Sequence, residues 1–220
     1  MASGYKIATM TAQAKLNALI DANKVKEFVK KYNLTDLNQK QTEKSFRNQV
    51  TLKIPIIDIW LSSVEDKKVH NASLKIFNNG RLHITGCNSD NMIKAIISKG
   101  ISYILLSNSI IKTQQEDITE NDSVDNEKYV LNKHEILMIN TSFDVGKKLC
   151  LHTLWQDLMI KHNLCSTYDL KVYVGINSKF ISSNGSRVTM LIFNSGKIIL
   201  TGPRELESID EAYNFIKSVV

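Results

Sequence analysis

The chain of 220 residues is 43% hydrophobic and 23% charged, which is ordinary for globular proteins and excludes global disorder. No apolar run approaches the ~18 residues that cross a bilayer, and the first residues lack the apolar core of a signal peptide, so we expect no membrane partner. A net charge of +6 is compatible with a polyanionic partner. Three widely spaced cysteines without a CxxC pattern argue against a disulfide framework and a zinc site.

Charge is distributed unevenly along the chain. Residues 1–112 hold 17 basic and 8 acidic residues, a net charge of +9, whereas residues 135–220 hold 9 and 8, a net charge of +1. Between them, residues 113–134 hold 2 basic and 6 acidic residues and show no hydrophobic period. We therefore predict an exposed acidic linker over 113–134 that separates two parts of the chain.

The predicted elements follow the same order in both parts: a strand, an amphipathic helix, a further strand, a hairpin and a closing helix. In the first part these elements are expected over residues 5–13, 24–32, 49–54, 74–86 and 89–100. In the second part they are expected over residues 135–143, 152–162, 170–175, 190–202 and 205–220. Long loops are expected over 55–71 and 175–187, where Trp60 and Phe180 are either buried anchors or partner contacts.

The two hairpins are copies of one another. Residues 74–86 read LKIFNNGRLHITG and residues 190–202 read MLIFNSGKIILTG, with six of thirteen positions identical and no gap. Asn-Gly and Ser-Gly suit tight turns between antiparallel strands. Strands joined by hairpins, with the helices set apart, predict an α+β fold built from an internal repeat.

Side chains alternate between the two faces of a strand, so each hairpin has a core face and an opposite face. The core faces are uniformly apolar. The opposite face carries Lys75, Phe77, Arg81, His83 and Thr85 in the first copy, and Leu191, Phe193, Lys197, Ile199 and Thr201 in the second. Each copy thus places one phenylalanine away from its core. A loop or helix could cover that ring, or the ring could act as a wedge or stacking platform on a basic sheet.

The pattern Phe-x-x-Gly-basic-x-x-x-Thr-Gly makes the resemblance specific. The segment LIFNSGKIILTG with its trailing helix resembles the second repeat of the TATA-box-binding protein family, and IFNNGRLHITG resembles the corresponding hairpin of the first repeat. MINTSFDVGKKLCL (138–151) is similar to the family's second opening strand, and TYDLKVYVG (167–175) resembles the strand after its first helix. The composition, rich in Lys, Ile and Asn, points to a divergent homologue from a large DNA virus.

The resemblance implies a fold and a mode of binding. The family forms a saddle of two pseudo-symmetric repeats that share one curved antiparallel sheet, with helices on the convex side. Its concave face binds the minor groove of promoter DNA, where phenylalanines insert between base steps and kink the duplex.

The same resemblance implies roles for individual residues. Phe77 and Phe193 match the intercalating phenylalanines, and Thr85 and Thr201 match the threonines that contact the groove. Leu191 and Ile199 match apolar groove contacts, Arg81 and Lys197 match the basic residue after the hairpin glycine, and Tyr168 and Phe46 are candidates for a second intercalating ring in each repeat.

The chain departs from the family at several groove positions. Lys75 and His83 stand where the family has apolar contacts. The positions of the family's two base-reading asparagines fall near Ile7 and Met138, and Asn140 lies two residues farther along on the same face. Selectivity for A·T over G·C could then depend on groove width and deformability.

The sequence therefore predicts a non-enzymatic transcription initiation factor without cofactor, metal or small-molecule substrate. It would bind and bend AT-rich duplex DNA in the minor groove and recruit a B-class initiation factor and RNA polymerase, in the nucleus or in a cytoplasmic viral factory or virion. The alternative is a saddle-shaped module in transcription or repair whose open face binds protein rather than DNA. The altered asparagine positions favour this alternative, whereas the duplicated phenylalanines and basic residues favour DNA.

Overall fold

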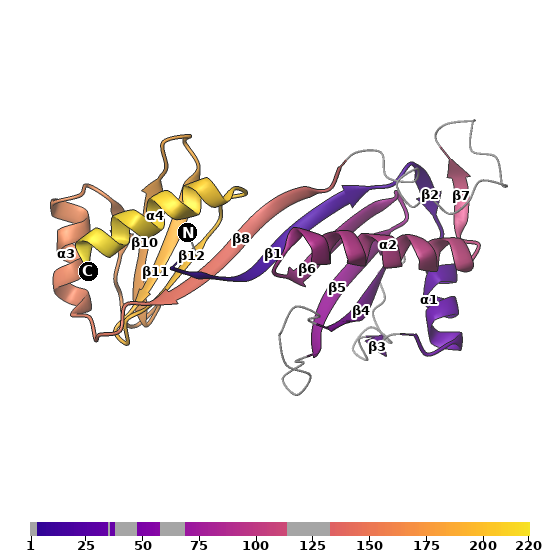
Figure 1. Ribbon diagram of the computed structural model, residues 1–220, viewed down its shortest axis with the longest axis horizontal. Helices are drawn as coiled ribbons and strands as arrows, with labels where there is room; N and C mark the ends of the chain where they lie inside the picture. The colour runs from indigo at the N-terminus through magenta and orange to yellow at the C-terminus, as the bar shows by residue number, and fades with distance from the viewer. Residues whose placement is uncertain (1–3, 35, 38–47, 58–68, 114–132) are drawn as a thin grey trace. The chain divides into compact units, whose positions relative to one another are not determined.

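The computed structural model describes residues 4–34, 36–37, 48–57, 69–113 and 133–220. These residues form two compact units (Figure 1): a first-repeat unit of residues 11–135, and a second-repeat unit that combines residues 4–10 with residues 136–220. Among the described residues, no helix is long and apolar enough to span a membrane. Phe46, Trp60 and most of the predicted linker lie outside the described residues.

The first-repeat unit is an antiparallel sheet with two helices. Its strands are the later part of β1 (Lys6–Lys15), β3 (Asp36–Leu37), β4 (Gln49–Ile57), β5 (Val69–Phe77) and β6 (Arg81–Cys87). They are ordered β3-β4-β5-β6-β1. A separate pair joins β2 (Ala18–Ile20) to β7 (Ile110–Thr113). The helices α1 (Ala22–Lys31) and α2 (Asp90–Leu106) pack against each other, α1 against β4 and α2 against β5 and β6.

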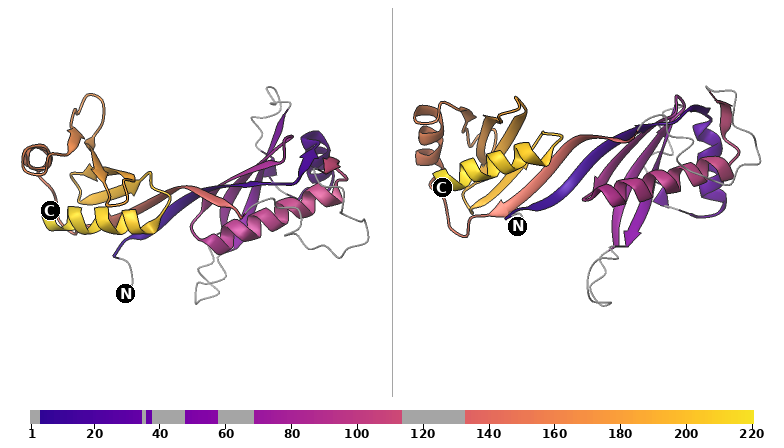
Figure 2. Two further views of the ribbon diagram at one scale, coloured as in Figure 1. Left: turned by 90° about the horizontal axis from the view of Figure 1, so that it is seen from above. Right: turned by 45° about the horizontal axis from the view of Figure 1, so that its top comes forward.

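The second-repeat unit has the same plan. Its strands are the beginning of β1 with β8 (Glu135–Asp144), β9 (Cys165–Thr167), β10 (Gly175–Ile181), β11 (Arg187–Phe193) and β12 (Lys197–Thr201), ordered β1-β8-β12-β11-β10-β9. Helix α3 (Leu151–Ile160) packs against β9 and β10, and α4 (Leu206–Val219) packs against β11 and β12. Figure 2 shows α4 extended along one face of its strands.

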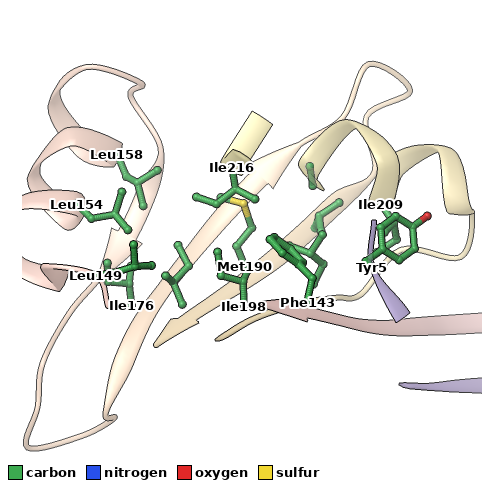
Figure 3. Packing of buried hydrophobic residues seen from close by; sticks show 14 of the residues in the cluster. Tyr5, Phe143, Leu149, Leu154, Leu158, Ile176, Met190, Ile198, Ile209 and Ile216 are labelled. Atoms are coloured by element: carbon green, nitrogen blue, oxygen red, sulfur yellow. The ribbon is translucent and has the colours of Figure 1, made fainter. Parts of the chain in front are cut away.

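The core of the second-repeat unit lies between its sheet and its helices (Figure 3). The side chains that alternation predicts for the core face are fully buried there: Met190, Ile192, Ile198 and Leu200. Their counterparts in the first hairpin, Leu74, Ile76, Leu82 and Ile84, are fully buried as well. Burial of a Leu or Ile side chain contributes about 1.5–3 kcal/mol, so both sheets are held to their helices by the same four positions.

Helix ends agree with local sequence signals. Asp21 precedes α1 and its carboxylate accepts hydrogen bonds from the backbone N–H groups of Asn23 (3.0 Å) and Lys24 (3.4 Å). Ser89 precedes α2 and its hydroxyl accepts from the N–H of Met92 at 3.4 Å. These side chains satisfy N–H groups that have no partner inside the helix.

Two predicted boundaries in the second repeat are wrong. Residues 170–174 are not a strand, because Asp169 folds them into a turn: its side chain accepts from Lys171 N–H (2.9 Å) and its carbonyl from Tyr173 N–H (2.8 Å). The predicted loop over 175–187 is largely strand β10, which pairs with β11 along its whole length. Phe180 lies on β10 and contacts Phe215 of α4, with ring centroids 5.1 Å apart, so it is a packing residue of this unit.

The first residues of the chain belong to the second-repeat unit, unlike the predicted division at the linker. Tyr5 is buried against Phe143, Ile209 and other residues of that core, and its hydroxyl donates to Asp210 at 2.6 Å. Burial and this carboxylate raise the pKa of Tyr5 above its ordinary value. The unit boundary therefore falls inside β1, after Met10.

The two hairpin glycines occupy equivalent, restricted positions. Gly80 and Gly196 have φ of 79° and 94°, in the left-handed region. Their carbonyls accept from Leu16 N–H (2.8 Å) and Val145 N–H (3.0 Å), just beyond the opening strands. A Cβ at Gly80 would lie 2.3 Å from the carbonyl oxygen of Ala18, and one at Gly196 would lie 2.3 Å from that of Lys147. Backbone conformation and close packing both require glycine here.

We predict that Gly196→Ala lowers the free energy of unfolding by about 2–4 kcal/mol, because it adds left-handed strain and a clash with backbone. Gly185→Ala is the matched control: Gly185 has φ of 80°, but a Cβ there would meet no atom within 4 Å. It should cost only about 1 kcal/mol. Urea unfolding followed by circular dichroism measures both, and equal losses would contradict the packing argument.

Candidate nucleic-acid interface

Each unit has an open face, formed by strand side chains that point away from its helices. On the second open face, cross-strand pairing aligns these side chains in rows. One row contains Asn140, Thr201, Thr189 and Lys179, and the next contains Ser142, Ile199, Leu191 and Asn177. The core-face residues between them are fully buried, whereas these side chains are half-buried. The face therefore combines a polar row with a row that is apolar at its centre.

The polar row is connected by side-chain hydrogen bonds. Thr201 Oγ1 donates to Asn140 Oδ1, and Asn140 Nδ2 donates to Thr9 Oγ1 at 2.9 Å. At the other end, Lys179 Nζ donates to Thr189 Oγ1 at 2.9 Å. Asn140 is thus held between β1 and β12, and its amide plane is fixed at this end of the row.

The apolar row adjoins an aromatic pair. Leu191 and Ile199 face each other across β11 and β12. Phe193, at the end of β11, is half-buried, and its ring lies 5.9 Å from that of Tyr173. Gly175 is paired with Phe193, and a Cβ there would lie 3.2 Å from the phenylalanine ring, so the glycine leaves room for it. Lys197 is exposed beside the turn.

The ring beside Phe193 is that of Tyr173, whereas Tyr168, the sequence candidate for a second intercalating ring in this repeat, has a different neighbour. Tyr168 packs on the helix side, with its ring 6.4 Å from that of Trp155 and in contact with the hydrophobic core. The Asp169 turn reverses the chain between the two tyrosines. The sequence signal that could have identified Tyr173 is its position two residues before Gly175, the residue that pairs with Phe193.

The first open face has the same layout with different chemistry. Cross-strand pairing places His83 opposite Lys75 and Lys75 opposite Thr51, in the row that corresponds to Ile199, Leu191 and Asn177. Thr85 pairs with Ser73, which pairs with Lys53. Phe77 is half-buried at the end of β5, and Arg81 is exposed after the turn, like Phe193 and Lys197. This face is therefore cationic where the second is aliphatic.

His83 is the unusual group on the first open face. Its Nδ1 is buried without a hydrogen-bond partner among the described residues. Burial, and secondarily the charge of Lys75, hold the pKa of His83 below its ordinary value. The imidazole is therefore neutral at pH 7.

The structure also corrects one predicted equivalence between the repeats. The N–H groups of Leu16 and Val145 donate to the carbonyls of the two equivalent hairpin glycines, so Leu16 and Val145 are themselves equivalent. Thr9 and Met138 each lie seven residues earlier in the chain, and they therefore correspond to each other. The counterpart of Met138 is Thr9 and not Ile7. Thr9 is the residue that contacts Asn140, so the polar groups at this place come from Thr9 and Asn140.

Among the described residues, no group of three or more His, Cys, Asp or Glu side chains could hold a metal ion.

Comparison with known proteins agrees with the repeated hairpin and its open faces. The sequence model of the family described as transcription factor TFIID, or TATA-binding protein, matches residues 133–220. The TATA-box-binding protein-like protein of Acanthamoeba polyphaga mimivirus is 26% identical over 98% of this chain. The chain is thus similar to TATA-binding proteins, and the match to the family model covers its second repeat. Its viral relative agrees with the expected resemblance to large-DNA-virus homologues.

Two further comparisons define the extent of this similarity. The TATA-box-binding protein of Caenorhabditis elegans is 34% identical over 65 residues, which are 30% of this chain and 18% of that protein. The chain spans 64% of the length of the mimivirus relative. The solved TBP of Methanococcus jannaschii matches 98% of this chain and 97% of its own, with a TM-score of 0.64 and 18% identity. That likeness shows the fold, and the predicted α+β saddle fold is confirmed.

We predict that neighbouring residues on opposite faces of this TATA-binding-protein-like sheet differ in their contribution to stability. Ile192→Ala removes a fully buried side chain of β11 and should cost about 2–5 kcal/mol. Phe193→Ala removes a larger side chain from the open face and should cost about 1 kcal/mol. Chemical denaturation of both variants checks the assignment, and a larger loss at Phe193 would show that its ring belongs to the core.

Proposed function

We propose that this protein is a DNA-binding transcription initiation factor whose open faces bind the minor groove of AT-rich duplex DNA and bend it. The observation that carries the proposal is duplication: both repeats place a half-buried phenylalanine, an exposed basic residue and a threonine at equivalent positions of the open face. Stability alone does not require this, because the helices already cover the opposite face of each sheet.

The bending step would depend on Phe77 and Phe193. An apolar ring that enters between two base pairs replaces part of the stacking that the kink removes. Phe193 has Tyr173 as its neighbour, so two rings rather than one are available to the opened base step in the second repeat. AT-rich steps such as TA are easily unstacked, which reduces the cost of the kink.

The other side chains of the open faces would supply affinity and selectivity. Leu191 and Ile199 present aliphatic surface, against which the N2 amino group of a G·C pair would be buried without an acceptor. Thr201 and Asn140 can exchange their mutual hydrogen bond for bonds to base edges. Arg81 and Lys197, both exposed, would neutralise phosphates beside the groove.

A bent promoter complex would then be the platform for a B-class initiation factor and RNA polymerase. Activity in the nucleus or in a viral factory belongs to the same proposal, which draws on the named relatives from mimivirus and Caenorhabditis elegans. We propose no catalytic activity for the chain.

We predict that the double substitution Phe77→Ala and Phe193→Ala largely abolishes DNA bending and leaves the fold intact. Unstacking a base step costs a few kcal/mol that the rings no longer offset. Fluorescence energy transfer between the ends of a labelled AT-rich duplex measures bending, and circular dichroism controls for folding. Wild-type bending by the double variant would refute insertion of these rings.

Replacing Arg81 or Lys197 with Ala should have a different effect. Each substitution removes one phosphate contact, so it should weaken binding to all duplex sequences about equally and reduce the slope of log K against log salt by roughly one unit. Gel-shift titrations at several salt concentrations measure the slope. Ser195→Ala, at an exposed position of the same turn, is the control and should leave the slope unchanged. A wild-type protein that binds no duplex at low salt would favour the protein-interaction alternative.

A further inference from the structure

The two open faces differ most at one row, which is aliphatic in the second repeat and ionisable in the first. Ile199 and Leu191 are replaced by His83 and Lys75, which face each other directly across β5 and β6. Both replacements carry N–H donors, and only His83 can change its charge near neutral pH.

We infer that the first repeat takes up a proton at His83 when it binds duplex DNA, and that His83 and Lys75 then act as a donor-only pair for the minor groove. This inference rests on the proposed DNA-binding function. It extends that function by assigning a pH-dependent step and a source of base selectivity to the first repeat.

The free protein disfavours the charged imidazole for two reasons visible in the structure. The ammonium of Lys75 lies across the strand pair, and a second positive charge there would be repelled. A proton on Nδ1 would also place a buried N–H where no described residue accepts it. Both effects agree with the lowered pKa of His83.

The remaining charged groups around this row do not change that balance. Helix α2 packs on the opposite side of β6. Among the described residues, the groups on the open face and on β1 include Lys53, Arg81, Lys15, whose ammonium donates to the Asn79 carbonyl, and Gln13, which donates to Glu135 at 2.7 Å. Glu135 already accepts from Gln13, and the register of β3 and β4 places the other acidic residue, Asp36, opposite Lys53 and outside the row of His83. The other charged residues named here are basic.

Duplex DNA would reverse the preference. The minor groove has a negative potential, and each A·T pair presents only acceptors there, adenine N3 and thymine O2. An imidazolium beside an ammonium matches that pattern, so binding should raise the pKa of His83 and draw a proton from solvent. A G·C pair adds an N2–H donor, which a neutral histidine can accept but a charged one cannot. Selectivity of this half-site for A·T should therefore increase as pH falls.

The test is a fluorescence-anisotropy titration of the full chain with one AT-rich duplex at constant ionic strength between pH 8 and pH 6. An average uptake of about one quarter to one half of a proton across this range predicts a Kd that falls by about threefold to tenfold. His83→Gln keeps a polar side chain of similar size but cannot be charged, so its Kd should be nearly constant. Ile199→Gln, at the equivalent position of the second repeat, is the matched control and should keep the wild-type pH dependence.

A second measurement uses duplexes in which single A·T pairs are replaced by G·C in turn. For the wild type, the penalty of at least one replacement should grow as pH falls, and His83→Gln should lose that growth while its circular dichroism stays unchanged. Binding that is independent of pH, or equally pH-dependent in His83→Gln, would overturn this inference and leave the proposed function intact. Absence of duplex binding at every pH would instead overturn the proposed function and this inference with it.

Discussion

The register of the two hairpins determines which side chains face outward, and that register is fixed at Gly80 and Gly196. Each glycine has a positive φ and lies against the backbone that leaves the opening strand, so an added side chain would displace both segments. Because the side-chain period of a strand is two, a slip of one residue would bury the phenylalanine and lysine and expose the core. Core packing and the candidate interface are therefore set by one backbone constraint.

Much of this arrangement could be predicted from the sequence, because alternation and turn residues are local signals. The IFNNG and IFNSG turns and the apolar positions around them identified both hairpins, both core faces and the placement of Phe77 and Phe193. The error in the strand assignment of the second repeat arose where residues typical of a strand are folded into a turn by a local hydrogen bond. Leu170–Val174 reads as a strand, but the Asp169 side chain and carbonyl fold it into a turn, and this change moves Tyr173 next to Phe193 in place of Tyr168.

Other features required contacts between residues far apart in the chain. No sequence pattern indicates that Tyr5 packs with the second repeat, because its partner Asp210 is 205 residues away. The same holds for Asn140. The sequence shows it only as an asparagine two residues from the expected position, and its hydrogen bonds with Thr9 and Thr201 appear only in the structure. These bonds join Thr9, Asn140 and Thr201 into one hydrogen-bonded group, so Thr9 and Asn140 together provide polar groups where the resemblance suggests a single asparagine. The two repeats thus share one backbone plan and differ in the chemistry of their open faces, one aliphatic and the other cationic.

The central claim is that the open faces read DNA from the minor groove, and inosine substitution tests it most directly. An inosine·cytosine pair presents the minor-groove pattern of A·T and the major-groove pattern of G·C, since it lacks only the N2 amino group. Affinity should therefore be measured for three duplexes of equal length that contain A·T, I·C or G·C pairs. The account predicts that the I·C duplex binds as tightly as the A·T duplex and that the G·C duplex binds more weakly. An I·C duplex that binds as weakly as G·C would contradict it.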